Sequence, residues 1–167
     1  EILRCLVGSE MCIRDRVKTV GVTGEFVTGS HGVTVKADLK PEEISFNNID
    51  GVVLPGGMPG TVNLGKSETV TKAAVHCAEN GKITAAICAA PSVLGNLGIL
   101  KGKKATCFPG FEKELEGATY TAAPVEIDGN VITGKGAGCA ILFGKAIVEK
   151  AVSAEAANKV CGDMQCP

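Results

Sequence analysis

Two short apolar runs, each followed at once by a sharp turn, constrain the fold of this chain most. Residues 50–54 and 83–87 consist largely of Val, Leu, Ile and Ala, and each run is shorter than an ordinary helix. Strands without polar alternation are typical of parallel sheets that are covered on both faces. Pro-Gly-Gly at 55–57 ends the first run, and Cys88 follows the second. The sequence therefore predicts a buried parallel sheet with turns at the carboxyl ends of its strands.

Extended and helical segments alternate along most of the chain. Ser67 is expected to cap a helix that Asn80-Gly81 closes, and Asp128-Gly129-Asn130 is a strong hairpin signal. We expect further strands at 17–22, 32–37, 105–108, 125–127 and 131–133, a helical turn from Pro41, and helices from Pro91, over 138–152 and over 154–160. This order predicts an α/β fold, a three-layer flavodoxin-like sandwich whose mostly parallel sheet carries helices on both faces. Ligands bind at the carboxyl ends of the strands in such sheets.

The composition excludes several classes of protein. A length of 167 residues fits one domain, and a net charge of −1 with scattered charges gives no support for nucleic-acid binding. No apolar run reaches the roughly 18 residues that a membrane span needs. The eight cysteines lie mostly in apolar segments, with no CxxC pair and no zinc-ligand spacing. We therefore expect a reduced, cytoplasmic protein without a structural metal.

The first residues do not fit the pattern. Only nine residues separate Leu6-Val7 from Val17, which is too few for a helical crossover between parallel strands. We expect residues 1–16 to be a foreign or disordered segment, 17–160 to be a single domain, and 161–167 to be a polar tail. The first strand–helix unit would then be missing or replaced. In the tail, the spacing of Cys161 and Cys166 permits a disulfide without requiring one.

Cys88 is the candidate nucleophile. It follows a buried strand, and the small residues Ala89 and Ala90 precede Pro91, which is suited to the first turn of a helix. A nucleophile elbow needs such a turn with small neighbours, and the amides and dipole of a following helix favour a thiolate. The alternative is an inert core thiol, because free cysteines are often buried. The strand–Cys–small–small–Pro context favours the nucleophile.

Backbone groups near Cys88 are the candidates for binding an anion. We expect Gly56, Gly57 and Ala89, together with the amide of Cys88 itself, to cradle an oxyanion, or a sulfinate if the thiol oxidises. The Gly-Gly pair alone indicates only a turn. Its weight comes from its position, because the ends of adjacent strands would put both loops over one crevice.

The residues around these two turns closely resemble the ThiJ/PfpI family. The resemblance is carried by Asp50-Gly51-Val52-Val53-Leu54-Pro55-Gly56-Gly57 and by Ala85-Ala86-Ile87-Cys88-Ala89-Ala90-Pro91. Further matches are Gly29-Ser30-His31-Gly32 with Asp38, Thr106-Cys107-Phe108-Pro109, and Thr133-Gly134-Lys135-Gly136-Ala137-Gly138. The resemblance covers about residues 17–152. It implies a class I glutamine amidotransferase-like fold, a homodimer, and no metal or organic cofactor.

The resemblance also implies an activity and a set of site-lining residues. Members of the family hydrate methylglyoxal or glyoxal, remove early glycation adducts, or act as oxidative-stress sensors or chaperones. The enzymatic route would begin with a hemithioacetal on Cys88. We expect Cys107, Phe108, Gly138 and Cys139 to line the site. Cys107 is also a candidate resolving thiol, although a packed strand cysteine is the simpler interpretation.

Two departures from the family pattern matter for function. In the family, a glutamate after the first strand holds a proton against the nucleophile, and no Glu of this chain occupies that context. Glu10, after Gly8-Ser9, is the nearest imitation and is not expected to serve, so we expect weak or no turnover. Ala89 stands where peptidase-like branches carry a histidine, which disfavours proteolysis.

Two functions from different classes therefore remain open. The first is a cofactor-independent glyoxalase or deglycase acting on small reactive carbonyls. The second is a redox sensor or chaperone in which Cys88 oxidises to a sulfinate without turnover. The expected partners are a small carbonyl or an oxidant and a second copy of the chain, with no membrane and no specific nucleic acid.

Overall fold

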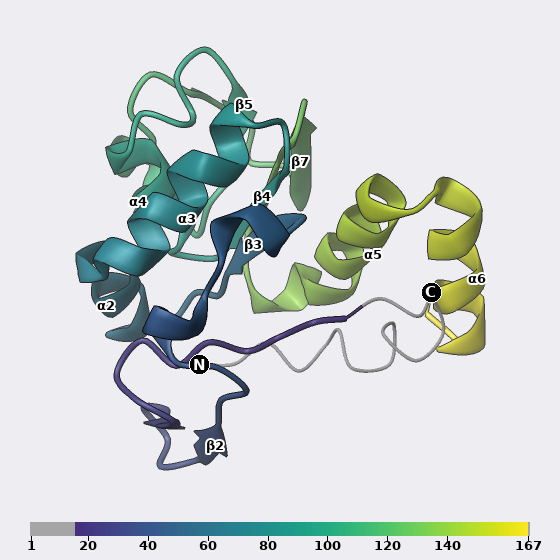
Figure 1. Cartoon of the computed structure of the whole chain (residues 1–167). Helices are drawn as coiled ribbons and strands as arrows, with labels where there is room; N and C mark the ends of the chain where they lie inside the picture. Colours follow the sequence, from purple (N-terminus) through teal and green to yellow (C-terminus); the bar gives the residue numbers. More distant parts are fainter. Residues whose placement is uncertain (1–15, 167) are drawn as a thin grey trace.

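The computed structural model describes residues 16–166 and is built around a four-stranded sheet of order β3-β4-β8-β7 (Figure 1). Strands β3 (Gly51–Leu54), β4 (Ile83–Ile87) and β8 (Val131–Gly134) run parallel, and β7 (Val125–Asp128) pairs with β8 as an antiparallel hairpin. Gly129 turns this hairpin with a positive φ of 66°. The hairpin and both apolar strands are confirmed.

The register aligns the carboxyl ends of the three parallel strands. Leu54 lies opposite Ala86, and Ile87 lies opposite Gly134. The loops that follow β3, β4 and β8 therefore start at the same edge of the sheet, as parallel strands require. These loops carry most of the residues that the sequence singled out.

Strand β4 buries both of its faces, which explains its apolar sequence. On one face, Ala86 packs in a core with Leu54 and with residues of α3 (Glu68–Glu79). On the other face, Ala85 and Ile87 pack against α5 (Ala140–Ala151). Helices therefore cover both faces of the sheet (Figure 1), which confirms the predicted flavodoxin-like sandwich.

Helix α3 forms where its capping and apolar residues predict it. The Ser67 hydroxyl accepts a hydrogen bond from the Val70 amide at 3.5 Å, and Gly81 takes a positive φ of 68° just beyond the end of the helix. The buried residues of the helix recur every three or four positions: Val70, Ala73, Ala74 and Cys77. The predicted helix is confirmed.

The remaining elements are short. They are β1 (Phe26–Thr28), β2 (Thr34–Lys36), α2 (Gly60–Lys66), α4 (Pro91–Asn96), β5 (Lys104–Ala105), β6 (Thr119–Tyr120), α6 (Ala154–Asp163), and 3-10 turns at Pro41–Glu43, Phe46–Asn48, Glu112–Glu114 and Ala137–Cys139. Strands β1 and β2 form a hairpin outside the main sheet, and β5 pairs with β6. Helix α6 packs on α5 and extends into residues 161–163, where the sequence predicted a polar tail.

Two predicted strands differ from the structure. Residues 17–22 form no strand, and only Val20 makes an isolated bridge, to Leu39. The Asp38 carboxylate accepts hydrogen bonds from the amide and hydroxyl of Thr19 at 2.8 and 2.6 Å, and backbone bonds join Thr19 and Gly21 to residues 38 and 39, so the pairing stops at a single bridge. The strand predicted at 105–108 shrinks to β5, because Phe108 bonds to the Cys88 carbonyl instead of to a neighbouring strand.

The expectations for the first residues are not tested by the structure. Residues 1–15, which make up most of the segment expected to be foreign or disordered in place of the first strand–helix unit, lie outside the described residues. Within residues 16–166, the helices are all too short or too polar to cross a lipid bilayer.

The stability of the sandwich depends on the α5 side of the sheet. We expect Phe143→Ala to lower the free energy of unfolding by about 3–5 kcal/mol, because it opens a cavity between α5 and β4. Phe143 is 1% exposed, whereas the adjacent Leu142 is 49% exposed. Leu142→Ala is the matched control and should change stability by no more than about 0.5 kcal/mol. Urea unfolding followed by circular dichroism measures both, and equal effects would contradict the assignment of this core.

Candidate active site

Cys88 occupies a strained turn at the end of β4. Its φ is +66°, a left-handed conformation that costs an L-residue about 1–2 kcal/mol. Two backbone hydrogen bonds hold it: the Cys88 amide donates to the Gly134 carbonyl, and its carbonyl accepts from the Phe108 amide, both at 2.8 Å. The half-buried thiol is thus presented by a turn fixed on both sides. A strained residue held by its surroundings is typical of functional sites.

The residues after Cys88 are small because no space remains around them. Ala89 and Ala90 are 2% and 0% exposed, and the Ser92 hydroxyl donates to the Ala89 carbonyl at 2.7 Å. This packing explains the Ala-Ala sequence of the elbow. Helix α4 has only six residues, so it contributes less of the dipole that the sequence analysis invoked for the thiolate.

The loop after β3 packs directly against the elbow. A Cβ on Gly56 would lie 2.5 Å from the Cys88 Cβ and 2.7 Å from the Ile87 carbonyl oxygen, so only glycine fits. Gly57 is required for a different reason, because its φ is +92°. The two loops therefore meet over the same edge of the sheet, as their strand positions predicted.

One of the amides proposed for anion binding is already occupied. The Cys88 amide donates to Gly134, so it is not free to bind an oxyanion as the sequence analysis suggested. The amides of Gly57 and Ala89 make no hydrogen bond to any atom of residues 16–166. These two amides remain the candidate oxyanion donors, and Gly56 supplies the close approach.

Cys107 lies beside the elbow but is poorly suited to react. It is fully buried, and burial together with the negative charges of Glu112 and Cys88 raises the pKa of its thiol to about 11. A thiol with that pKa stays protonated near neutral pH, and a protonated thiol is a weak nucleophile. The environment therefore favours a packed structural cysteine over a resolving thiol.

Phe108 and the loop after β8 lie in contact with each other near the elbow. Phe108 is 47% exposed, and a Cβ on Gly136 would lie 3.4 Å from its ring, so loop and ring are in close contact. Gly138 is exposed and Cys139 is half-buried on the 3-10 turn that follows. Their position after β8 places them at the correct edge of the sheet, and their lining role stays a prediction.

No proton donor for the Cys88 sulfur is found within residues 16–166. No side chain or amide there forms a hydrogen bond to this sulfur. Glu10, the weak candidate for the family's glutamate, lies outside the described residues. The same residues contain no group of three or more His, Cys, Asp or Glu side chains placed to hold a metal ion.

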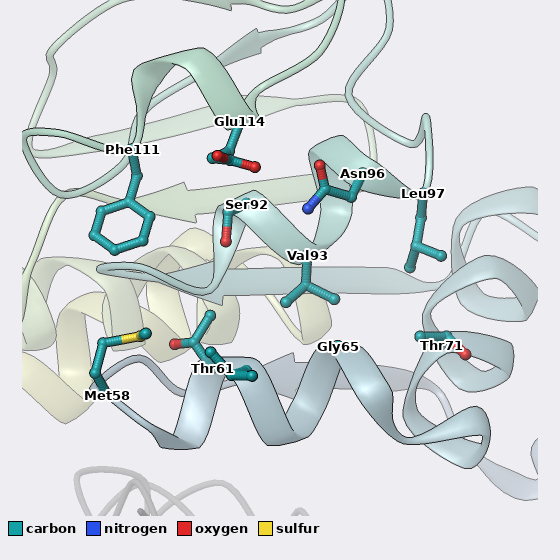
Figure 2. A pocket seen from close by; sticks show the side chains of 11 residues that line it. Met58, Thr61, Gly65, Thr71, Ser92, Val93, Asn96, Leu97, Phe111 and Glu114 are labelled. Atoms are coloured by element: carbon teal, nitrogen blue, oxygen red, sulfur yellow. The ribbon is translucent and has the colours of Figure 1, made fainter.

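A groove of about 350 Å³ lies next to the elbow and was not foreseen from the sequence (Figure 2). Met58 and Phe111 lie at one end of it and Thr71 and Leu97 at the other. Cys88 does not line the groove, but Met58 follows Gly57 directly, and Ser92 bonds to Ala89. The groove is mainly apolar, and its walls come from four separated segments: Met58, Thr61, Val62, Gly65, Thr71, Ser92, Val93, Asn96, Leu97, Phe111 and Glu114.

Known proteins match both the sequence and the fold. The model of the DJ-1/PfpI family matches residues 14–150. The chain is 36% identical over 140 residues to protein DJ-1 homolog B of Arabidopsis thaliana, a match covering 83% of this chain and 32% of that protein. It is 36% identical over 112 residues to a deglycase of Pyrococcus abyssi, covering 65% of this chain and 66% of that protein. The chain thus spans about a third of the plant relative.

Solved structures agree with these matches. The crystal structure of DJ-1beta of Drosophila melanogaster superposes with a TM-score of 0.86 at 30% identity, covering 97% of this chain and 90% of that chain. Toxoplasma gondii DJ-1, described as oxidized, gives a TM-score of 0.87 at 30% identity, with 96% and 90% covered.

The contact between the two loops predicts the effect of a small substitution. Gly56→Ala should lower stability by at least about 1–3 kcal/mol and change the alkylation rate of Cys88, because the new methyl group meets backbone on both sides. Gly60→Ala is the matched control, since a Cβ there meets no atom within 4 Å. Thermal unfolding and iodoacetamide labelling measure the two effects. Indistinguishable variants would refute the close contact.

The buried Cys107 predicts a dependence of stability on alkaline pH. Its pKa is raised in the folded state to about 11 from an ordinary value of 9.0, so the folded protein holds the proton more tightly than the unfolded chain. The resulting stabilisation is complete below pH 9 and is lost as the pH rises through 11. The wild-type protein should therefore lose stability relative to Cys107→Ala across this window. Cys77, whose pKa burial also raises, titrates in both proteins and cancels. Parallel stability curves would contradict the prediction.

Proposed function

This chain belongs to the DJ-1/PfpI family, and on that premise we propose that it is a cysteine-dependent, cofactor-independent glyoxalase and deglycase acting on small reactive carbonyls. Relatives that it matches at about 36% identity include archaeal deglycases. The observation that carries the proposal is the backbone of Cys88, held at a φ of +66° beside the amides of Gly57 and Ala89, which bond to no atom of residues 16–166. A core thiol would need neither the strain nor the open amides.

The first chemical step is addition of the Cys88 thiolate to the aldehyde carbon of methylglyoxal. A carbon–sulfur bond forms, and the electron pair of the carbonyl π bond moves to oxygen. The amides of Ala89 and Gly57 are the candidate donors of hydrogen bonds that stabilise the resulting oxyanion. A proton taken up by this oxygen completes the hemithioacetal.

The later steps rearrange protons within the adduct and add one water molecule. The proton on the former aldehyde carbon leaves and the ketone oxygen takes up a proton, which gives an enediol. A proton then adds to the former ketone carbon while the hydroxyl on the sulfur-bearing carbon loses its proton, which gives a thioester of the hydroxy acid. Water then attacks the thioester carbonyl, the carbon–sulfur bond breaks, and Cys88 leaves as the thiolate. The net reaction is hydration of methylglyoxal to lactate, with no external oxidant or reductant.

The groove beside the elbow supports a substrate larger than methylglyoxal. Two of its lining residues belong to the segments that form the elbow, because Met58 follows Gly57 and Ser92 bonds to the Ala89 carbonyl. An early glycation adduct carries an amine-linked chain beyond its reactive carbon. We assign this groove to that chain, and the Cys88 turn to the reactive carbon.

A second function, oxidative sensing at Cys88, is favoured by the same two amides, which have no hydrogen-bond partner among residues 16–166. Oxidation of the half-buried thiol by peroxide to a sulfinate adds two oxygens that the amides of Ala89 and Gly57 are suited to bind. A solved relative, Toxoplasma gondii DJ-1, is described as oxidized. This function needs no proton donor for the sulfur.

The enzymatic proposal is tested with methylglyoxal and Cys88→Ala. We expect the wild-type chain to form lactate slowly and Cys88→Ala to form none, because the first bond is made to the sulfur. Cys161→Ala, a cysteine on α6 far along the chain, is the control and should keep the wild-type rate. Lactate is measured enzymatically over hours. Lactate formation by Cys88→Ala would contradict the role of Cys88 as the catalytic nucleophile.

A labelling experiment separates addition from turnover. Methylglyoxal should protect Cys88 from iodoacetamide even where lactate formation is slow, because the hemithioacetal occupies the sulfur. If neither lactate nor protection is found, but peroxide adds two oxygen atoms at Cys88 alone, the enzymatic proposal fails and the sensor takes its place.

A further inference from the structure

The carboxyl end of α6 closes in a specific hydrogen-bonded turn. The Cys166 amide donates to the Cys161 carbonyl at 2.9 Å, and the Gln165 amide donates to the Gly162 carbonyl at 3.0 Å. Gln165 takes the left-handed conformation with a φ of +54°. This pair of bonds around a left-handed residue is the Schellman motif.

The Schellman motif brings two particular side chains together. The residue after the left-handed position commonly contacts the residue five positions earlier, and that contact is usually apolar. Here both positions are cysteines. Both residues are half-buried, and burial together with the neighbouring Cys161 raises the pKa of Cys166.

We propose that Cys161 and Cys166 are a redox modification site that closes to an intramolecular disulfide under peroxide. The sulfur of Cys161 attacks one peroxide oxygen, the oxygen–oxygen bond breaks, and a sulfenic acid and one water form. The sulfur of Cys166 then attacks the sulfenic sulfur, the sulfur–oxygen bond breaks, and a second water leaves. Two thiols are oxidised, one peroxide is reduced to two waters, and a thiol reductant reverses the step.

Two features of the structure favour this pair over the buried cysteines. Cys77 and Cys107 are fully buried, so neither is open to peroxide. The turn is held by side-chain bonding as well, because Gln165 Nε2 donates to the Gly162 carbonyl at 2.8 Å. The Schellman turn already places the two cysteines at the two positions whose side chains commonly meet, so closing the bond follows the existing course of the chain. The site is separate from Cys88 and does not depend on the proposed function.

The sequence allows a direct test by mass spectrometry. Trypsin cleaves after Lys159, so both cysteines fall on one peptide, 160–167, apart from every other cysteine. The full chain is treated with one equivalent of hydrogen peroxide, alkylated and digested. We expect peptide 160–167 to lose the mass of two hydrogen atoms, to resist alkylation, and to regain both alkylation sites after dithiothreitol. Oxidation of Met164 adds an oxygen atom and is distinguishable.

Variants make the test specific. Cys161→Ser and Cys166→Ser should each lose the disulfide completely while keeping one alkylated cysteine in the untreated protein. Cys88→Ser is the matched control and should form the disulfide to the wild-type extent. The proposal is overturned if the peptide gains only oxygen atoms at sulfur, if either cysteine links instead to another peptide or another chain, or if Cys88→Ser abolishes the bond.

Discussion

The backbone of Cys88 is held from both sides, and most of the site depends on that restraint. Its amide donates to Gly134 at the end of β8, and its carbonyl accepts from Phe108 in the segment after β5. These bonds come from two different parts of the chain, so the left-handed turn exists only when the sheet is assembled. The cost of the turn, about 1–2 kcal/mol, is small beside the stability of a domain of this size. Folding itself therefore presents the thiol.

The fold could be predicted wherever the burial of an element produces a clear pattern of apolar and polar residues in the sequence. Residues 83–87 carry no polar alternation because Ala85 and Ala86 face two different cores. Helix α3 is recognisable in the sequence by a capping serine and by apolar residues at helical spacing. A strand was also predicted at 17–22, yet only Val20 forms a bridge there, and the Asp38 side chain accepts a hydrogen bond from the Thr19 amide. A single sequence does not show which backbone groups a distant side chain will bind.

Some features of the site could likewise be predicted from the sequence, and others could not. The elbow could be found from the sequence because a strand, a cysteine, two alanines and a proline leave few other interpretations. The groove could not, because its walls come from α2 and the loop before it, α3, α4, and the segment from Phe111 to Glu114. Helix α2 contains two glycines in seven residues, which weakens any helical signal. The hydrogen bond from the Cys88 amide to the Gly134 carbonyl could not be predicted either, because it depends on the register of β4 against β8.

Local environment, more than residue type, separates the cysteines of this chain by chemistry. Cys107 is sealed in the core and keeps its proton to about pH 11, so it packs and does not react. Left-handed backbone conformations position both Cys88 and Cys166. Cys88 itself adopts this conformation, and Gln165 adopts it just before Cys166, so that the Cys166 amide bonds to the Cys161 carbonyl. The third such non-glycine residue among those described, Ala122, offers its carbonyl to the Lys135 ammonium in the loop after β8. Backbone strain in this fold therefore accompanies polar or reactive groups, at a cost that packing elsewhere offsets.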